Sequence, residues 1–155
     1  MRGAAHPRSG ASRPLGMSLH SDAPFGLAAS VRAHGRGISR ALARYHPTVT
    51  SGNAAVLPEI LRRIVVAYRP TRIYLFGSEA RGDAGEDSDL DLAVIVRDDA
   101  PEHEARPRIA AEVLWGLDRG ADVVVLREAD FSARRRVVAS LPWIIEREGK
   151  LLYGA

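Results

Sequence analysis

The chain has 155 residues, no cysteine and a formal net charge of +3. A chain of this length holds one domain, with or without a tail, and excludes a second large domain. The absence of cysteine excludes a disulfide framework, a thiolate metal site and a cysteine nucleophile. No stretch approaches about 18 consecutive apolar residues and the N-terminus lacks an apolar signal-peptide core, so we expect neither a membrane span nor secretion, and a cytoplasmic location.

The charge is divided unevenly along the chain. Residues 1–54 hold seven arginines and one acid, giving +6, whereas residues 55–155 hold 15 basic and 18 acidic side chains, giving −3. The basic character therefore belongs to the first segment. Because the remainder lacks the clustered basic face of nucleic-acid-binding domains, we expect no nucleic-acid partner.

Residues 1–54 are rich in Gly, Ala, Ser, Pro and Arg and show no sustained hydrophobic period, which predicts a disordered or low-order tail. Two explanations of this tail stay open. An Arg-rich, acid-poor leader resembles a mitochondrial transit peptide. Alternatively, the reading frame extends upstream of the true start, with Met17 or a later codon as the first, and we favour this second explanation.

The folded part begins with a predicted helix. Pro58 suits its first turn, apolar residues recur at helical spacing up to Tyr68, and Arg69-Pro70 ends it. The apolar runs Ile73–Phe76 and Leu90–Val96 predict two strands. Their connection is too short for a helical crossover, so we expect the two strands to be antiparallel neighbours.

The connection between these strands carries the polar residues of interest. Gly77-Ser78 leads into a short helical segment, Glu79 to Gly82, with Ser78 as its predicted N-cap. Backbone N–H groups at such a helix start can hold a phosphate. Asp89 and Asp91 open the second strand and, because side chains alternate, project from one face. Two carboxylates on one face favour a hard cation, although a solvated strand start is the simpler alternative for either acid alone.

A second helix is predicted between the second and third strands. Asp98-Asp99 offers an N-cap before Pro101, and Gly120 closes the helix. Its apolar stripe consists of Ile109, Val113, Leu114 and Leu117. Pro107 marks either a kink in this helix or its true beginning.

The third strand is Ala121–Leu126, and its link from the second strand is long enough for a parallel crossover. Such a crossover places Asp122 at the same sheet edge as Asp89. A helix from Glu128 or Asp130 to Leu141 should follow, with a further helix from Pro142 to Glu148 and a short closing strand or packed tail at 151–153. The expected fold is α/β of the α+β kind, with a small mixed sheet and flanking helices.

Gly77-Ser78, ten intervening residues and Asp89-x-Asp91 together resemble the pattern of the DNA polymerase β-like nucleotidyltransferase superfamily. The likeness is closest to its minimal, stand-alone members, with which Ala80-Arg81-Gly82 and Ser88 also agree. Four fixed residues, two strands and a third aspartate agree together, so the motif is specific. The resemblance implies a nucleotidyltransferase domain over residues 55–155.

The resemblance also implies roles for these residues. Asp89 and Asp91 would bridge two Mg²⁺ ions, and Asp122 would complete the metal site that holds the acceptor hydroxyl and help to take its proton. Gly77 and Ser78 would hold the β- and γ-phosphates of ATP.

The arginines of two segments can each be interpreted in two ways. Arg81 either binds a triphosphate oxygen or pairs with Asp83 or Glu86 at the surface. Arg134-Arg135-Arg136 either grips a phosphate or an acidic partner, or forms a solvated helix face.

Minimal members of the superfamily are often paired with a separate helical HEPN protein of RNase-toxin type, whose tyrosine they adenylylate. The leading hypothesis is therefore an antitoxin that transfers AMP from ATP to a HEPN-type toxin, in a hetero-oligomer. One alternative is a nucleotidyltransferase acting on a small hydroxylated molecule such as an aminoglycoside. Another is a non-catalytic module that binds nucleotide or occludes its partner.

Overall fold

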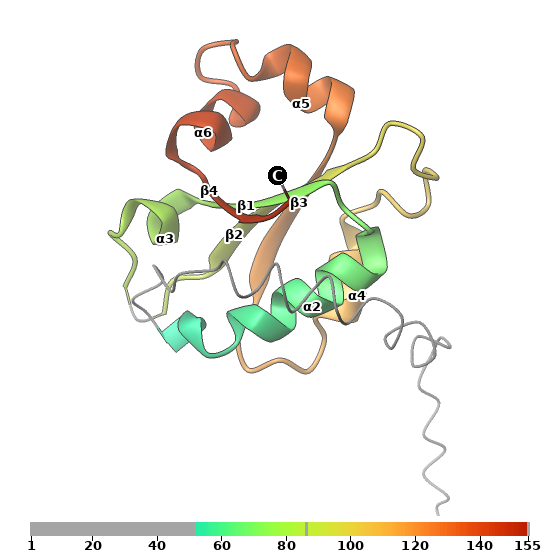
Figure 1. Cartoon of the computed structure of the whole chain (residues 1–155). Coiled ribbons are helices and arrows are strands. Elements are labelled where there is room, and N and C mark those ends of the chain that lie inside the picture. The colour runs from blue at the N-terminus through green and yellow to red at the C-terminus, as the bar shows by residue number, and fades with distance from the viewer. Residues whose placement is uncertain (1–51, 86, 155) are drawn as a thin grey trace, which may run out of the picture.

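The computed structural model describes residues 52–85 and 87–154 (Figure 1). The predicted tail lies outside these ranges except for Gly52–Ala54, which forms the short 3₁₀ helix η1. The strands are β1 (Arg72–Phe76), β2 (Leu90–Val96), β3 (Ala121–Arg127) and β4 (Lys150–Tyr153). The helices are α2 (Leu57–Tyr68), α3 (Gly77–Arg81), α4 (Arg108–Val113), α5 (Glu128–Arg134) and α6 (Leu141–Glu148).

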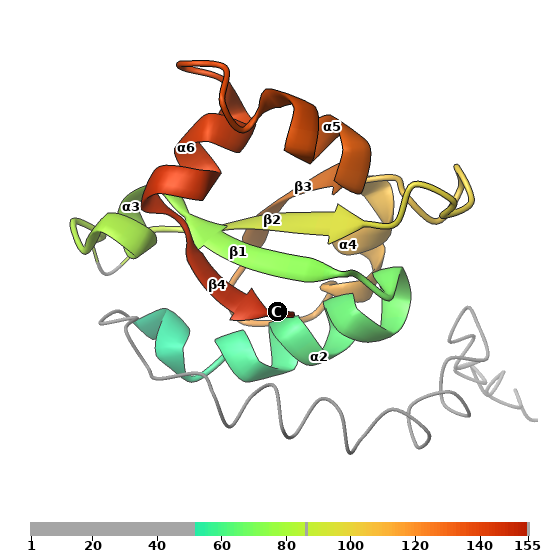
Figure 2. The same ribbon diagram turned by 45° about the horizontal axis from the view of Figure 1, so that its top comes forward.

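The four strands form one mixed sheet in the order β3-β2-β1-β4. β1 pairs antiparallel with β2 and with β4, while β2 pairs parallel with β3. The predicted antiparallel hairpin and parallel crossover are therefore both confirmed. Helices cover both faces of this sheet, with α5 and α6 on one side and α2 on the other (Figure 2). The predicted α/β architecture of a small mixed sheet with flanking helices is confirmed.

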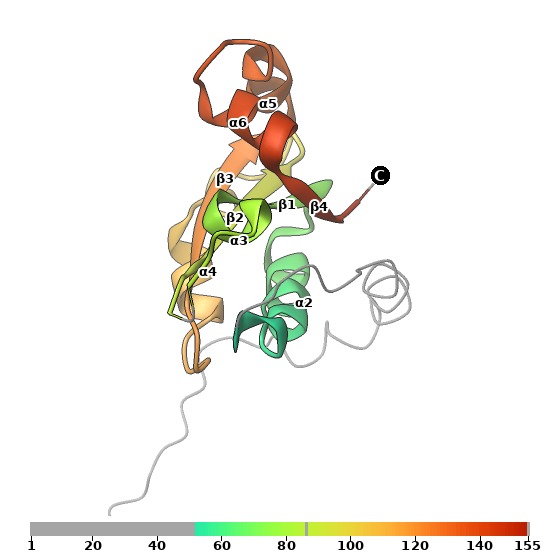
Figure 3. The same ribbon diagram turned by 90° about the vertical axis from the view of Figure 1, so that its left-hand side faces the viewer.

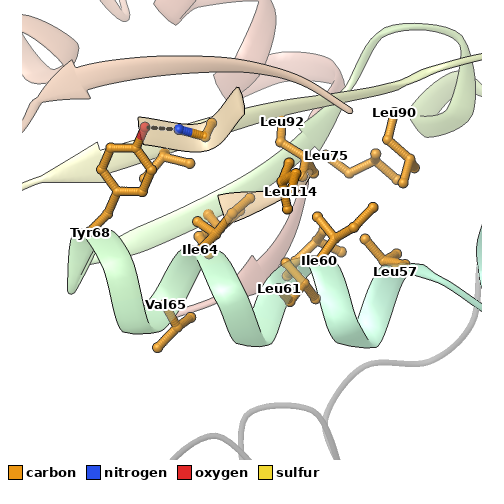
Figure 4. Close-up of a cluster of buried hydrophobic side chains, with 14 of the residues drawn as sticks. Leu57, Ile60, Leu61, Ile64, Val65, Tyr68, Leu75, Leu90, Leu92 and Leu114 are labelled. Atoms are coloured by element: carbon orange, nitrogen blue, oxygen red, sulfur yellow. Dashed lines mark hydrogen bonds between the residues drawn. The ribbon is translucent and has the colours of Figure 1, made fainter. Parts of the chain in front are cut away.

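The larger core lies between the sheet and the helices α2 and α4. Ile60, Ile64 and Leu57 on α2 are fully buried and meet Leu75, Leu90 and Leu92 of the sheet (Figure 4). The helical spacing of the apolar residues of α2 predicted this face, because positions three and four apart lie on one side of a helix. Arg69, with a φ of 46°, ends α2 directly after Tyr68, as predicted.

The opposite face of the sheet carries a smaller core. Ala93 and Ile95 of β2 pack with Phe131 of α5 and Ile145 of α6, and all four are fully buried. Ala93 and Ile95 alternate along β2 with Leu90 and Leu92, which belong to the larger core. Figure 3 shows α5 and α6 together on one side of the sheet, away from α2. Asp91 alternates in step with Ala93 and Ile95 along β2, so its carboxylate projects on the side of the sheet where α5 and α6 lie.

Two predictions of helix capping were wrong. Ser78 does not cap α3, because the helix begins one residue earlier, at Gly77, and its N-cap residue makes no side-chain cap bond. Asp98 does not cap a helix before Pro101, because its carboxylate accepts a hydrogen bond from the backbone N–H of Ala129, in the first turn of α5. Residues 101–105 form turns instead.

The two helices around β3 are also shorter than predicted. α4 begins directly after Pro107, so that proline marks the true helix start, but it ends at Val113 rather than Gly120. α5 ends at Arg134 rather than continuing to Leu141, because residues 135–140 form turns in which Ala139 has a φ of 62°. The Ser140 hydroxyl then accepts from Trp143 N at 3.3 Å and caps the start of α6.

Candidate active site

Asp91 and Asp122 are direct register partners across the parallel strands β2 and β3. Each is the second residue of its strand. Because partnered residues of neighbouring strands project to the same face, the two carboxylates share one side of the sheet at one edge. Asp89 lies two residues before Asp91, just outside β2, and is exposed. The structure thus brings the three predicted carboxylates to one edge.

Gly77 lies against the Asp91 side chain. Its neighbour Phe76 is the β1 residue paired with Asp91, so the chain leaves β1 directly beside this carboxylate. A Cβ atom on Gly77 would lie 2.0 Å from Asp91 Oδ2, and the residue has a φ of +70°. Both the space and the backbone conformation therefore require glycine at this position. The close approach joins the first half of the motif to the second.

The electrostatics of the site are dominated by negative charge. Burial raises the pKa of Asp91 above its ordinary value, and the carboxylates of Asp122 and then Asp89 raise it further. The Arg81 guanidinium acts in the opposite direction. A carboxylate that is partly desolvated and faces two others favours a compensating cation.

A magnesium site of the expected kind needs several oxygen donors close to one point. Within residues 52–85 and 87–154, no group of three acidic, histidine or cysteine side chains gathers in a way that could hold one ion. The three carboxylates at this sheet edge nevertheless supply the oxygen donors that a hard divalent cation prefers, and burial together with the neighbouring carboxylates disfavours the ionised form of Asp91. Asp89 and Asp122 are exposed and can therefore turn toward a bound ion.

Gly77 and Ser78 now form the first turn of α3, beside Asp91. The N–H groups of a first helical turn have no partner within the helix and can point at an anion. Ser78 contributes its backbone carbonyl to the end of α3, where it accepts from Gly82 N at 2.9 Å and from Asp83 N at 3.1 Å. These two bonds close the C-terminal end of α3 at Gly82.

Arg81 is half-exposed at the C-terminal end of α3. Its guanidinium contacts Asp83 at 3.2 Å and Glu148, at the end of α6, at 3.8 Å. The predicted surface pair with Asp83 is present. The positive charge of Arg81 also lowers the pKa of Asp91, against the larger raising effects of burial and the neighbouring carboxylates.

Two residues of the site's support were missed by sequence reasoning. Asn53 on η1 is fully buried, and Glu79 on α3 is 2% exposed. Their side chains hydrogen-bond at 2.7 Å. A glutamate in a short helix is ordinarily exposed, and Asn53 lies in a polar, glycine-rich stretch, so neither residue carries a sequence signal for burial.

Comparison with known proteins identifies the class of protein that this fold and site define. The family described as "Polymerase beta, Nucleotidyltransferase" matches residues 59–150, which is more than half of the chain. The chain therefore belongs to the polymerase beta nucleotidyltransferase family. This confirms the family, and with it the enzyme class, that the Gly77-Ser78 and Asp89-x-Asp91 pattern predicts.

The chain is also similar in sequence to one particular member of this class. The chain is 35% identical over 82 residues to the protein adenylyltransferase MntA of Shewanella oneidensis. The match covers 53% of this chain and 52% of the relative, so the chain spans about half the length of the curated relative it matches. The similarity supports the prediction that the chain is a minimal nucleotidyltransferase.

Two solved structures resemble this fold in part. A candidate nucleotidyltransferase of Sulfolobus solfataricus matches with a TM-score of 0.44 and 16% identity, over 74% of this chain and 85% of the other. A toxin-antitoxin crystal structure with AMP-PNP matches with a TM-score of 0.42 and 26% identity, over 63% of this chain and 73% of the other.

Within the described ranges, no helix is both long and apolar enough to cross a bilayer.

Proposed function

We propose that this protein transfers AMP from ATP to a hydroxyl group of a partner protein, in a magnesium-dependent reaction in the cytoplasm. The observation that carries the proposal is the facing pair Asp91 and Asp122, with Gly77 packed against Asp91. The named activity of the relative from Shewanella oneidensis supports a protein as the acceptor.

The reaction is a displacement at the α-phosphorus of ATP. The acceptor oxygen forms a bond to that phosphorus, the bond to the β-phosphate bridge breaks, and pyrophosphate leaves. Magnesium, when bound, neutralises charge on the phosphate oxygens and helps to ionise the acceptor hydroxyl. Asp89 and Asp91 would hold the metal, while Asp122 would accept the hydroxyl proton and the Gly77-Ser78 turn would hold the outer phosphates.

We further propose that the acceptor is a HEPN-type toxin, which this protein silences as an antitoxin within a hetero-oligomer. The support is the resemblance of the motif to minimal nucleotidyltransferases that act on such partners. The named activity of the Shewanella oneidensis relative, a protein adenylyltransferase, favours an external protein over an aminoglycoside.

The test uses ATP labelled at the α-phosphate, Mg²⁺ and the product of the neighbouring gene. The intact chain should label that protein, and the Asp91→Asn variant should not. Label on an aminoglycoside and none on the protein would support the small-molecule alternative. Neutralisation of the partner that survives Asp89→Asn combined with Asp91→Asn would support the non-catalytic module and overturn the proposal.

A further inference from the structure

A buried side-chain amide lies directly behind the candidate active site. The Asn53 Nδ2 group donates one hydrogen bond of 2.7 Å to Glu79 Oε1 and another of 2.7 Å to the backbone carbonyl of Ser88. Asn53 is fully buried, with 0% of its surface accessible to solvent. One amide therefore joins η1 to two segments that lie 26 and 35 residues further along the chain.

The two partners of this amide adjoin the two halves of the motif. Glu79 follows Ser78 directly in α3, and Ser88 directly precedes Asp89. Near the end of the connection between them, Gly85 N donates a hydrogen bond of 2.8 Å to the Ser88 hydroxyl. The Asn53 amide thus ties the segment that carries Gly77-Ser78 to the segment that carries Asp89 and Asp91.

Stability alone does not account for a polar pair in this position. Burying an amide and a carboxylate is unfavourable unless both are hydrogen-bonded, and replacing both partners with apolar groups of similar shape is often nearly neutral. The amide nevertheless has a geometric use, because its two donors fix the direction of two separate acceptors at once.

We propose that Asn53 and Glu79 are positioning residues, which hold the Gly77-Ser78 turn at a fixed separation from Asp89 and Asp91. The inference rests on the proposed function and deepens it, since it names the residues that set the distance between the two halves of the same site. Phosphates on the turn and a cation on the carboxylates belong to one bound nucleotide. A small change in their separation therefore weakens both contacts together.

The inference is tested with the full chain by calorimetric titration of a non-hydrolysable ATP analogue in the presence of Mg²⁺. Asn53→Ala should weaken binding of the analogue about tenfold or more and, with a partner as acceptor, lower kcat about 100-fold. Glu79→Gln keeps an oxygen that can accept from Asn53 Nδ2. It should therefore recover most of the affinity that Glu79→Ala loses.

Tyr68→Phe is the matched control for lost stability. Tyr68 is 3% exposed, and its hydroxyl donates to Arg106 O at 2.7 Å and accepts from Ala110 N at 2.8 Å (Figure 4). These bonds join α2 to α4, away from the carboxylate edge. The variant should lose thermal stability to a comparable degree while the affinity for the analogue stays unchanged.

Equal affinity for the analogue in Asn53→Ala and Tyr68→Phe would overturn the positioning role. Failure of the intact chain to label any partner, together with weaker analogue binding by Asn53→Ala, would count against the proposed acceptor and support the positioning role. Failure of the intact chain to bind the analogue with Mg²⁺ would overturn both proposals.

Discussion

Asp91 and Asp122 face each other across the parallel strands β2 and β3, as register partners at the same edge of the sheet. Partial burial of Asp91 disfavours its ionised form, and repulsion between the two side-by-side carboxylates adds to the unfavourable energy. The fold thus maintains an arrangement that costs stability in the absence of a cation. Such a conflict between stability and local chemistry is typical of a functional site.

The first prediction concerns Asp91→Asn. Labelling of the acceptor should fall at least about 100-fold, because the amide cannot replace an ionised metal ligand. Thermal stability at pH 7 without Mg²⁺ should be unchanged or higher, because the variant removes a partly buried charge. These results would be measured by transfer of label from ATP and by thermal unfolding.

The stability difference should depend on pH. The folded-state pKa of Asp91 is raised above the ordinary value of 3.8, so its ionisation disfavours folding above that folded-state pKa. As the pH falls below 3.8, Asp91 is protonated in both states and the advantage of Asp91→Asn should disappear. Asp83→Asn is the control, because Asp83 is exposed and pairs with Arg81 at the surface. A strongly destabilised Asp91→Asn would contradict this account of the charge.

The second prediction concerns Gly77→Ala. The new Cβ would lie 2.0 Å from Asp91 Oδ2, and the φ of +70° would be strained in alanine. We expect a loss of stability of about 1–3 kcal/mol together with loss of nucleotidyl transfer, because the carboxylate must move. Chemical denaturation and the labelling assay measure the two effects.

Gly82→Ala separates strain from displacement of the carboxylate. Gly82 has a φ of +84°, but a Cβ there would meet nothing within 4 Å. This variant should lose about 1 kcal/mol of stability from the backbone alone and retain transfer. Equal loss of transfer in the two variants would show that contact with Asp91 is not what makes Gly77 necessary.

Much of this arrangement could be predicted from the sequence because strand periodicity and loop length restrict topology strongly. The short link before Leu90 requires an antiparallel pair, and the longer link before Ala121 allows a parallel one. Together they place Asp122 beside Asp91. Side-chain alternation then gives the face on which both carboxylates lie.

The remaining features depend on contacts between distant segments. Asp98 looked like the cap of a nearby helix, but it accepts from Ala129 N, 31 residues further along the chain. Glu79 carries no sequence signal for burial, yet it is 2% exposed and accepts a hydrogen bond from Asn53, 26 residues earlier in the chain. Local propensity contains no information about such partners, so these interactions emerge only from the assembled fold.

The third prediction distinguishes the two interpretations of Arg81. If its guanidinium binds the triphosphate, Arg81→Gln should raise the KM for ATP about tenfold with a smaller change in kcat. Glu148→Gln removes the contact of 3.8 Å while leaving Arg81 in place, and should leave the KM unchanged or lower it. An unchanged KM in Arg81→Gln would assign Arg81 to the surface pair with Asp83.

The fourth prediction concerns α2, which supports the sheet away from the site. Glu59 accepts two hydrogen bonds of 2.7 Å from Arg62 and one of 2.8 Å from Arg63. These contacts, chiefly the hydrogen bonds from Arg62, lower the pKa of Glu59 from 4.5 to about 2. Because the carboxylate is more than one-third exposed, solvent screening limits the stabilisation to about 0.5 kcal/mol.

The pH dependence of this contribution follows from the direction of the shift. The folded-state pKa lies below the unfolded-state value, so ionised Glu59 stabilises the protein above about pH 4.5, and the contribution is lost as the pH falls toward 2. The difference in free energy of unfolding between the natural chain and Glu59→Gln should therefore shrink over that interval, as measured by urea titration at a series of pH values. Glu112→Gln, which removes the more exposed pair with Arg108, should change stability less at every pH. A difference for Glu59→Gln that stays constant from pH 7 to pH 2 would mean that its ion pairs do not stabilise α2.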